Sequence, residues 1–147
     1  MEYLIVKYVH LIGVLGVTGT LVAEFALIRK ELSIDEMKKL ARIDSFYGLF
    51  AIVALIGGFI LWFGVGKPAE FYSEGIWIYV KLILFTIIGV LSIFPTIFFL
   101  KNRKPNPERE QTGIQLPMYI ILIVRIEVAL LVFIPLFAVL MAAGVRI

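Results

Sequence analysis

The sequence predicts an all-α protein, an integral membrane four-helix bundle. Of its 147 residues, 61% are hydrophobic, whereas about 45–50% of the residues in ordinary soluble domains are apolar. The mean hydropathy is +1.01. Four segments are long and apolar enough to cross a hydrocarbon core of about 30 Å, which takes about 20 residues of helix. We therefore expect residues 1–147 to form a single transmembrane domain whose main partner is the lipid bilayer.

The first predicted span carries charged residues near its ends but none between Val9 and Ala23. This uncharged run is too long for the core of a signal peptide, and no convincing small-residue cleavage site follows it. We therefore expect the segment to be retained as a span. The four spans cover about residues 3–28, 45–64, 76–100 and 119–144.

Lys and Arg gather in the first and third connections between the spans, whereas the middle connection contains only Lys67. By the positive-inside rule, the first and third connections face the cytoplasm, and both termini face the outside of the cell's inner (cytoplasmic) membrane. Trp62 and Trp77 flank the middle connection, where an aromatic belt at the outer interface is expected. The basic residues are Arg29, Lys30, Lys38, Lys39 and Arg42 in the first connection and Lys101, Arg103, Lys104 and Arg109 in the third.

The two basic connections either contact anionic lipid headgroups or act only as determinants of topology. Ser33 and Glu36 form a capping-box pattern at the start of a helix, and apolar residues follow at helical spacing. We expect this helix to be amphipathic, to lie on the membrane and to run into the second span. The third connection, with Pro105, Pro107 and Gly113, is predicted to be a loop rich in turns.

Polar residues inside the spans are costly in lipid and are usually functional or paired. In the first span, His10 and Glu24 share one helix face, with Lys7 at its edge, and Lys81 opens a similar face in the third span. At about 1.5 Å per residue, the polar side chains separate into two layers. The outer layer contains His10, Lys81, Lys7 and Met141, and the inner layer contains Glu24, Asp44, Arg125 and Glu127.

The inner layer is a candidate buried polar network. Arg125 and Glu127 are two residues apart on one helix, so they point in nearly opposite directions. Glu127 shares its face with small or flexible residues, which favours an inward position. Arg125 is then left for the membrane interface or for a contact with another subunit of a homo-oligomer. The network either fixes the register of the helices or relays protons through its carboxyl groups.

The outer layer is a candidate cofactor site. A neutral imidazole is a good axial ligand for haem iron, so His10 is the candidate metal ligand. Lys81 and Lys7 are the candidate partners of the haem propionates, and Met141 or the same histidine of a second subunit is the other axial ligand. In the alternative interpretation, His10 hydrogen-bonds a backbone carbonyl freed by Pro135, and Met141 only fills space.

Several stretches resemble a family of small bacterial predicted membrane proteins without an assigned function, and the similarity runs over nearly the whole chain. These stretches are Tyr8–His10, Leu21–Glu24, Ala41–Asp44, Lys81–Phe85, Leu91–Thr96 and Ile134–Met141. A more distant likeness links the chain to the HemJ-like protoporphyrinogen oxidases and the CopD-like membrane proteins, in which His10 and Lys81 match a first-span histidine and a third-span lysine. The chain departs from them in having a single histidine, and a copper site would lack ligands.

Three functions follow from these observations. The first is a redox or porphyrin-handling protein that binds haem b in the outer half of the bundle; as an enzyme, it would be a membrane oxidoreductase resembling protoporphyrinogen oxidase. The second is a small transporter or proton-relay element that uses Glu24, Asp44 and Glu127. The third is a structural or assembly protein without a cofactor. The lack of cysteine excludes thiolate metal sites and thiol nucleophiles, and we expect no nucleic-acid partner.

Overall fold

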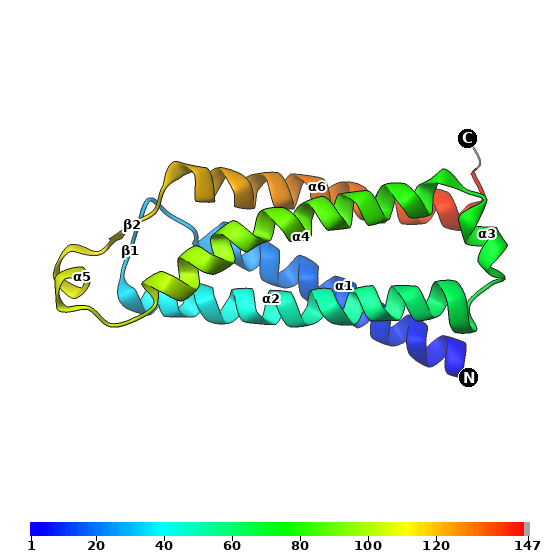
Figure 1. The fold of residues 1–147 in the computed structure, drawn as a ribbon, viewed down its shortest axis with the longest axis horizontal. Coiled ribbons are helices and arrows are strands. Elements are labelled where there is room, and N and C mark those ends of the chain that lie inside the picture. The colour runs from blue at the N-terminus through cyan, green and yellow to red at the C-terminus, as the bar shows by residue number, and fades with distance from the viewer. Residues whose placement is uncertain (146–147) are drawn as a thin grey trace.

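A computed structural model describes residues 1–145, apart from the side chains of Arg109 and Glu110. Arg109, one of the basic residues of the third connection, therefore lies outside the described side chains. Four helices run along the molecule (Figure 1), and each is long and apolar enough to cross a membrane. They are α1 (Glu2–Leu27), α2 (Ile34–Ile60, continued by the π-helical turn η1, Leu61–Val65), α4 (Ile76–Asn102) and α6 (Met118–Ala142). The predicted four-helix transmembrane bundle is confirmed.

The two ends of the bundle differ in what connects the helices. At one end, which we call the terminal end, lie both chain termini and the short helix α3 (Ala69–Ser73) (Figure 1). At the other, which we call the hairpin end, lie β1 (Glu31–Leu32), β2 (Ile114–Gln115) and the short helix α5 (Pro107–Thr112). An even number of crossings places both termini at the same end, as the sequence predicts.

A small antiparallel pairing joins the first connection to the third. Glu31 pairs with Gln115 and Leu32 with Ile114, and the Leu116 amide donates to the Lys30 carbonyl at 2.7 Å. The sequence does not predict this pairing, because each strand is only two residues long and carries no alternating pattern that could be recognised. It fixes the loop after α4 against the start of α2.

The start of α2 confirms one prediction and corrects another. The Ser33 hydroxyl accepts from the Glu36 amide at 3.2 Å, and the Glu36 carboxylate accepts from the Ser33 amide at 3.3 Å, so the capping box is present. The helix does not lie on the membrane. Its apolar residues are buried inside the bundle, because β1, β2 and the ends of α4 and α6 cover them. These residues are Ile34, Met37, Leu40 and Ala41.

Small residues allow α1 and α2 to approach closely. A Cβ atom added to Gly13 would lie 2.6 Å from the Ala54 backbone nitrogen, and one added to Gly57 would lie 2.9 Å from the His10 Cβ. Gly19, which faces away, has open space around it. The bundle therefore consists of two helix pairs, in which α1 packs mainly on α2 and α4 mainly on α6.

Burial is concentrated toward the hairpin end. In α4 the first fully buried residue is Ile88, and in α6 the last is Leu131. In α1 burial begins at Gly13, and in α2 it ends at Gly57. In the described chain, the parts of the four spans nearest the terminal end therefore contribute no fully buried side chain to a common core.

Gly13 and Gly19 give a matched pair for testing the close contact of α1 with α2. We expect Gly13→Ala to destabilise the protein by about 1–3 kcal/mol, because the added methyl group would overlap the α2 backbone. Gly19→Ala should be neutral or stabilising by up to about 1 kcal/mol, because alanine favours the helix and the space is open. Thermal unfolding of both variants in the same detergent measures the difference. Equal changes in the two variants would contradict the described packing.

Candidate functional site

Three buried carboxyl groups from three spans lie together inside the bundle. Glu24 in α1 is 1% exposed, Asp44 in α2 is 5% exposed, and Glu127 in α6 is 1% exposed. Each carboxyl group interacts electrostatically with at least one of the others. We call these three residues the carboxyl cluster.

Asp44 is the best-bonded member of the carboxyl cluster. The Thr96 hydroxyl of α4 donates to Asp44 Oδ1 at 3.0 Å, and the Glu24 carboxyl is hydrogen-bonded to the Asp44 carboxyl. A hydrogen bond between two carboxyl groups requires a proton on one of them, since a carboxylate only accepts. The two carboxyl groups can therefore share a proton.

Glu127 contributes an oxygen without a hydrogen-bond partner. Among the described residues, Oε1 of Glu127 and Oε1 of Glu24 are both buried and unsatisfied. Such atoms are rare in native structures, where nearly all buried polar atoms have a hydrogen-bond partner. Two oxygens of the carboxyl cluster therefore have no hydrogen-bond partner among the described residues.

Two further hydroxyl groups adjoin the carboxyl cluster. Tyr47 of α2 is 5% exposed, and its hydroxyl lies close enough to that of Ser92 in α4 for the two to interact. The Ser92 hydroxyl donates to the Gly89 carbonyl at 2.8 Å. Tyr47 also interacts electrostatically with all three carboxyl groups.

The carboxyl cluster lies between two apolar clusters, one on each side along the bundle. In α2, Asp44 falls between the members of the two apolar groups, and in α6 Glu127 does. In α1, Glu24 falls between Leu21 and the partly buried Ile28. The cluster nearer the hairpin end includes Leu32, Ile34, Met37, Leu40, Ala41, Phe99, Ile114, Leu116, Ile120 and Ile121. The cluster nearer the terminal end includes Val17, Leu21, Tyr47, Ile88 and Leu131. Packed side chains therefore separate the carboxyl groups from both membrane surfaces.

No cation accompanies the carboxyl cluster in the part of the chain that the structure describes. The groups that interact with Glu24 and Glu127 are themselves carboxyls, and the ion pair between Arg29 and Glu36 lies at the hairpin end. The sequence groups Arg125 with the buried network, and this is wrong, because Arg125 is exposed. At 100° per residue, a residue two positions from the buried Glu127 must face away from the core.

The described carboxyl and imidazole groups do not form a metal site. No group of three or more His, Cys, Asp or Glu side chains is arranged to hold a metal ion among the described residues. Protons are the ligands that fit carboxyl groups bonded to each other and to hydroxyls.

His10 of the predicted outer layer is bonded within the α1–α2 pair. Its Nδ1 lies 2.7 Å from the Ala54 carbonyl oxygen, and the ring is partly buried beside Gly58. The alternative in which Pro135 frees the acceptor carbonyl is wrong, because α1 packs on α2 at this level. Lys81 of α4 is partly buried and close enough to His10 for their charges to interact.

The other two residues of the outer layer are placed differently. The Lys7 ammonium lies 5.6 Å from the ring centroid of Tyr3, one turn away on the same helix, and Lys7 is exposed. Met141 is partly exposed in the last turn of α6. None of the described hydrogen bonds or ring contacts links Lys7 or Met141 to His10.

Sequence reasoning misses Tyr47, Ser92 and Thr96 as parts of the site. Tyr47 lies three residues after Asp44, so the two share a helix face, and this spacing is the signal that could have found it. The Thr96 bond to Asp44 could not be predicted, because it depends on how α4 meets α2.

Thr96 and Thr18 give a matched test of the bond to Asp44. We expect Thr96→Val to destabilise the protein by about 1–3 kcal/mol, because a buried carboxyl oxygen loses its donor. Thr18→Val has the same change of shape but removes only a bond to Val14 within α1, so its effect should be smaller. Thermal unfolding in detergent compares the stability of the two variants. An equal loss of stability would show that the bond to Asp44 contributes no more than a bond within one helix.

The comparisons with known proteins place the chain in one family. Residues 2–146 match the family described as "Predicted membrane protein (DUF2214)". No curated protein and no solved structure matches the chain, so the distant likeness to the HemJ-like and CopD-like proteins gains no support from them. The match covers nearly all of the chain, which therefore belongs to the DUF2214 family of predicted membrane proteins.

Proposed function

We propose that this protein handles protons inside the membrane, as a proton relay or as the proton-binding element of a small transporter. The observation that carries the proposal is the carboxyl cluster, in which Glu24, Asp44 and Glu127 are buried together without a cation. Ionisable side chains inside membrane spans are costly and rare, and they commonly mark ion or proton pathways.

The energetics favour protons as the ligands of the cluster. Three ionised carboxylates in an apolar surrounding would each lose hydration and would repel one another, at a cost of several kcal/mol per charge. Binding a proton removes one of these charges. The number of protons held can change only if the cluster exchanges them with water, so proton exchange is the chemistry that this site supports.

Exchange with water requires one of the two apolar clusters to open. Pro95 in α4 and Pro135 in α6 each remove a helical hydrogen bond, which makes bending easier at these positions. Pro95 is buried next to Thr96, the residue bonded to Asp44. A bend of α4 there would move the Thr96 donor and would change the access of Asp44. Discontinuous helices beside the binding site are typical of secondary transporters.

The orientation is part of the proposal. The hairpin end carries most of the lysine and arginine residues of the connections, which supports a cytoplasmic location for it and an outside location for both termini. The carboxyl cluster then lies nearer the cytoplasmic surface of the inner membrane than the outer one.

Infrared spectroscopy tests proton binding without knowledge of a transported substrate. We expect the folded protein to show the carbonyl stretch of a buried protonated carboxyl group, and a pH titration in vesicles to change its amplitude. Glu24→Gln or Asp44→Asn should remove this band, because either substitution removes one of the two carboxyl groups that share the proton. Glu127→Gln should abolish pH-driven proton movement into dye-loaded vesicles, which should otherwise exceed that of protein-free vesicles.

Glu70→Gln is the control, because Glu70 is exposed at the terminal end and lies outside the carboxyl cluster. It should leave both the band and the proton movement unchanged. Wild-type protein with no protonated-carboxyl band at any pH would overturn the proposal. If the band is present but no proton movement is detected, the cluster binds protons but does not transport them alone. Proton transport would then require a second solute.

A haem b site at His10 is a second candidate function. The observation that favours it is the bond from Nδ1 to the Ala54 carbonyl, because a histidine that donates from one ring nitrogen leaves the other free to bind a metal. Lys81 interacts with His10 and would hold a propionate. When bound, haem would supply one-electron redox chemistry. Lys7 and Met141, which the sequence adds to this site, have no described contact with His10.

The absorption spectrum tests the haem site. Protein expressed with ample haem precursor should show a Soret band, which His10→Ala should remove and Lys81→Ala should weaken, because these variants remove the ligand and the cation. Lys67→Ala is the matched control, since the Lys67 ammonium lies 4.0 Å from the Phe71 ring centroid at the same end of the bundle. Colourless protein that also fails to take up added haem would leave His10 as a packing residue.

A further inference from the structure

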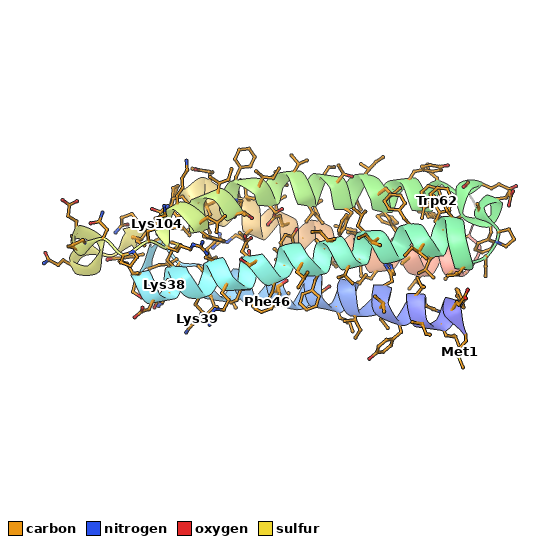
Figure 2. The ribbon with its side chains drawn as sticks, turned by 60° about the horizontal axis from the view of Figure 1, so that its bottom comes forward. Met1, Lys38, Lys39, Phe46, Trp62 and Lys104 are labelled. Carbon is orange, nitrogen blue, oxygen red and sulfur yellow. The ribbon has the colours of Figure 1, made fainter. Side chains whose placement is uncertain are left out.

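An open groove lies on the outside of the bundle near the hairpin end, between α2 and the end of α4. Figure 2 shows Lys38 and Phe46 along α2, with Phe46 farther from the hairpin end. The α2 residues that line the groove recur at helical spacing and form one stripe. The lining consists of Lys38, Arg42, Ser45, Phe46, Leu49 and Arg103.

The cations of this groove are not neutralised by the protein. Lys38, Arg42 and Arg103 are exposed, and none of them forms a hydrogen bond or an ion pair with a carboxylate among the described side chains. The Ser45 hydroxyl donates to the Ala41 carbonyl at 2.9 Å, so it offers an acceptor and no free hydrogen to the groove. Three positive charges from two helices therefore converge without a negative partner.

The depth of the groove places it across the boundary of the bilayer. Arg42 and Trp62 are 20 residues apart on one continuous helix, which corresponds to about 30 Å and matches the thickness of a hydrocarbon core. Trp62 lies near the terminal end (Figure 2), and placing it at one interface puts Arg42 at the other. Phe46 and Leu49 then lie about 6 Å and 10 Å deeper, and they are 50% and 55% exposed toward the lipid.

We propose that this groove binds one anionic glycerophospholipid from the leaflet at the hairpin end. Its phosphate contacts Arg42 and Arg103, with Lys38 nearer the water, and an acyl chain lies along Phe46 and Leu49. Arginine suits the headgroup because its guanidinium donates two parallel hydrogen bonds to phosphate oxygens. The proposal does not depend on the proton chemistry of the carboxyl cluster, which lies inside the bundle and does not line the groove.

The combination of charge and apolar surface favours a lipid over a soluble anion. A soluble phosphate needs only the cations, whereas this groove continues from the cations onto exposed aromatic and aliphatic side chains. The lipid would contact both α2 and the end of α4, which belong to different helix pairs. Because it binds only when these helices are folded together, its binding should raise thermal stability.

The test compares phosphatidylglycerol with phosphatidylcholine, using the full-length protein in detergent and native mass spectrometry of retained lipid. Wild-type protein should retain phosphatidylglycerol preferentially and should melt at a higher temperature in its presence. Arg42→Gln combined with Arg103→Gln should bind phosphatidylglycerol at least about fivefold more weakly than the control, because two charge-assisted bonds are lost. The control is Lys30→Gln combined with Lys101→Gln, which removes the same charge at the same end outside the groove.

Three outcomes would overturn the proposal. Equal loss of binding in the two double variants would mean that net charge alone attracts the lipid. Equal retention of both lipids by the wild-type protein would mean that the groove does not recognise an anionic headgroup. Displacement of phosphatidylglycerol by millimolar inorganic phosphate would mean that the site takes the free anion. Both double variants should melt like the wild type in phosphatidylcholine, which keeps a loss of binding distinct from a loss of folding.

Discussion

The requirement that polar groups in hydrocarbon find partners within the protein governs the arrangement of this bundle. No water is available at membrane depth to hydrate an exposed carboxyl group. Asp44 meets this requirement through the Thr96 hydroxyl at 3.0 Å and the Glu24 carboxyl, which come from two other helices. These two bonds fix the relative depth of α1, α2 and α4. A slip of one turn in α1 or α4 would remove one of these partners, and a slip in α2 would remove both.

The apolar clusters on either side of the carboxyl cluster depend on the same alignment. Toward the hairpin end, β1 and β2 close the bundle and cover the apolar face at the start of α2. Toward the terminal end, burial stops at about the level of Gly13 and Ile88. The bundle thus has a packed half, which holds the carboxyl groups, and a half in which the two helix pairs share little core. Motion that admits water is easier in the second half, because fewer packed contacts must be broken there.

The two polar layers differ in how completely the protein satisfies them. The three carboxyl groups of the inner layer are enclosed, and Asp44 is bonded to the Thr96 hydroxyl, whereas one oxygen each of Glu24 and Glu127 has no partner among the described residues. The outer layer contains a histidine bonded to its neighbouring helix and a lysine that is only partly buried. An enclosed group of carboxyls suits proton binding, whereas a partly exposed imidazole with one occupied nitrogen suits a ligand that enters from outside. The lipid-facing groove is separate from both layers and lies on the opposite side of α2 from the core.

The sequence by itself determined the membrane class, the four spans, the capping box at Ser33 and the inward direction of Glu24 and Glu127. These features depend on hydrophobicity and on the local geometry of single helices, which are properties of short segments. Only the tertiary structure decided that Glu24 bonds to Asp44 and that the Thr96 hydroxyl donates to Asp44. It also decided that the start of α2 lies within the bundle and that Ala54 binds His10. Each of these depends on which helices are neighbours and at what depth they meet, and helical periodicity in one segment carries no information about the rotation or register of another.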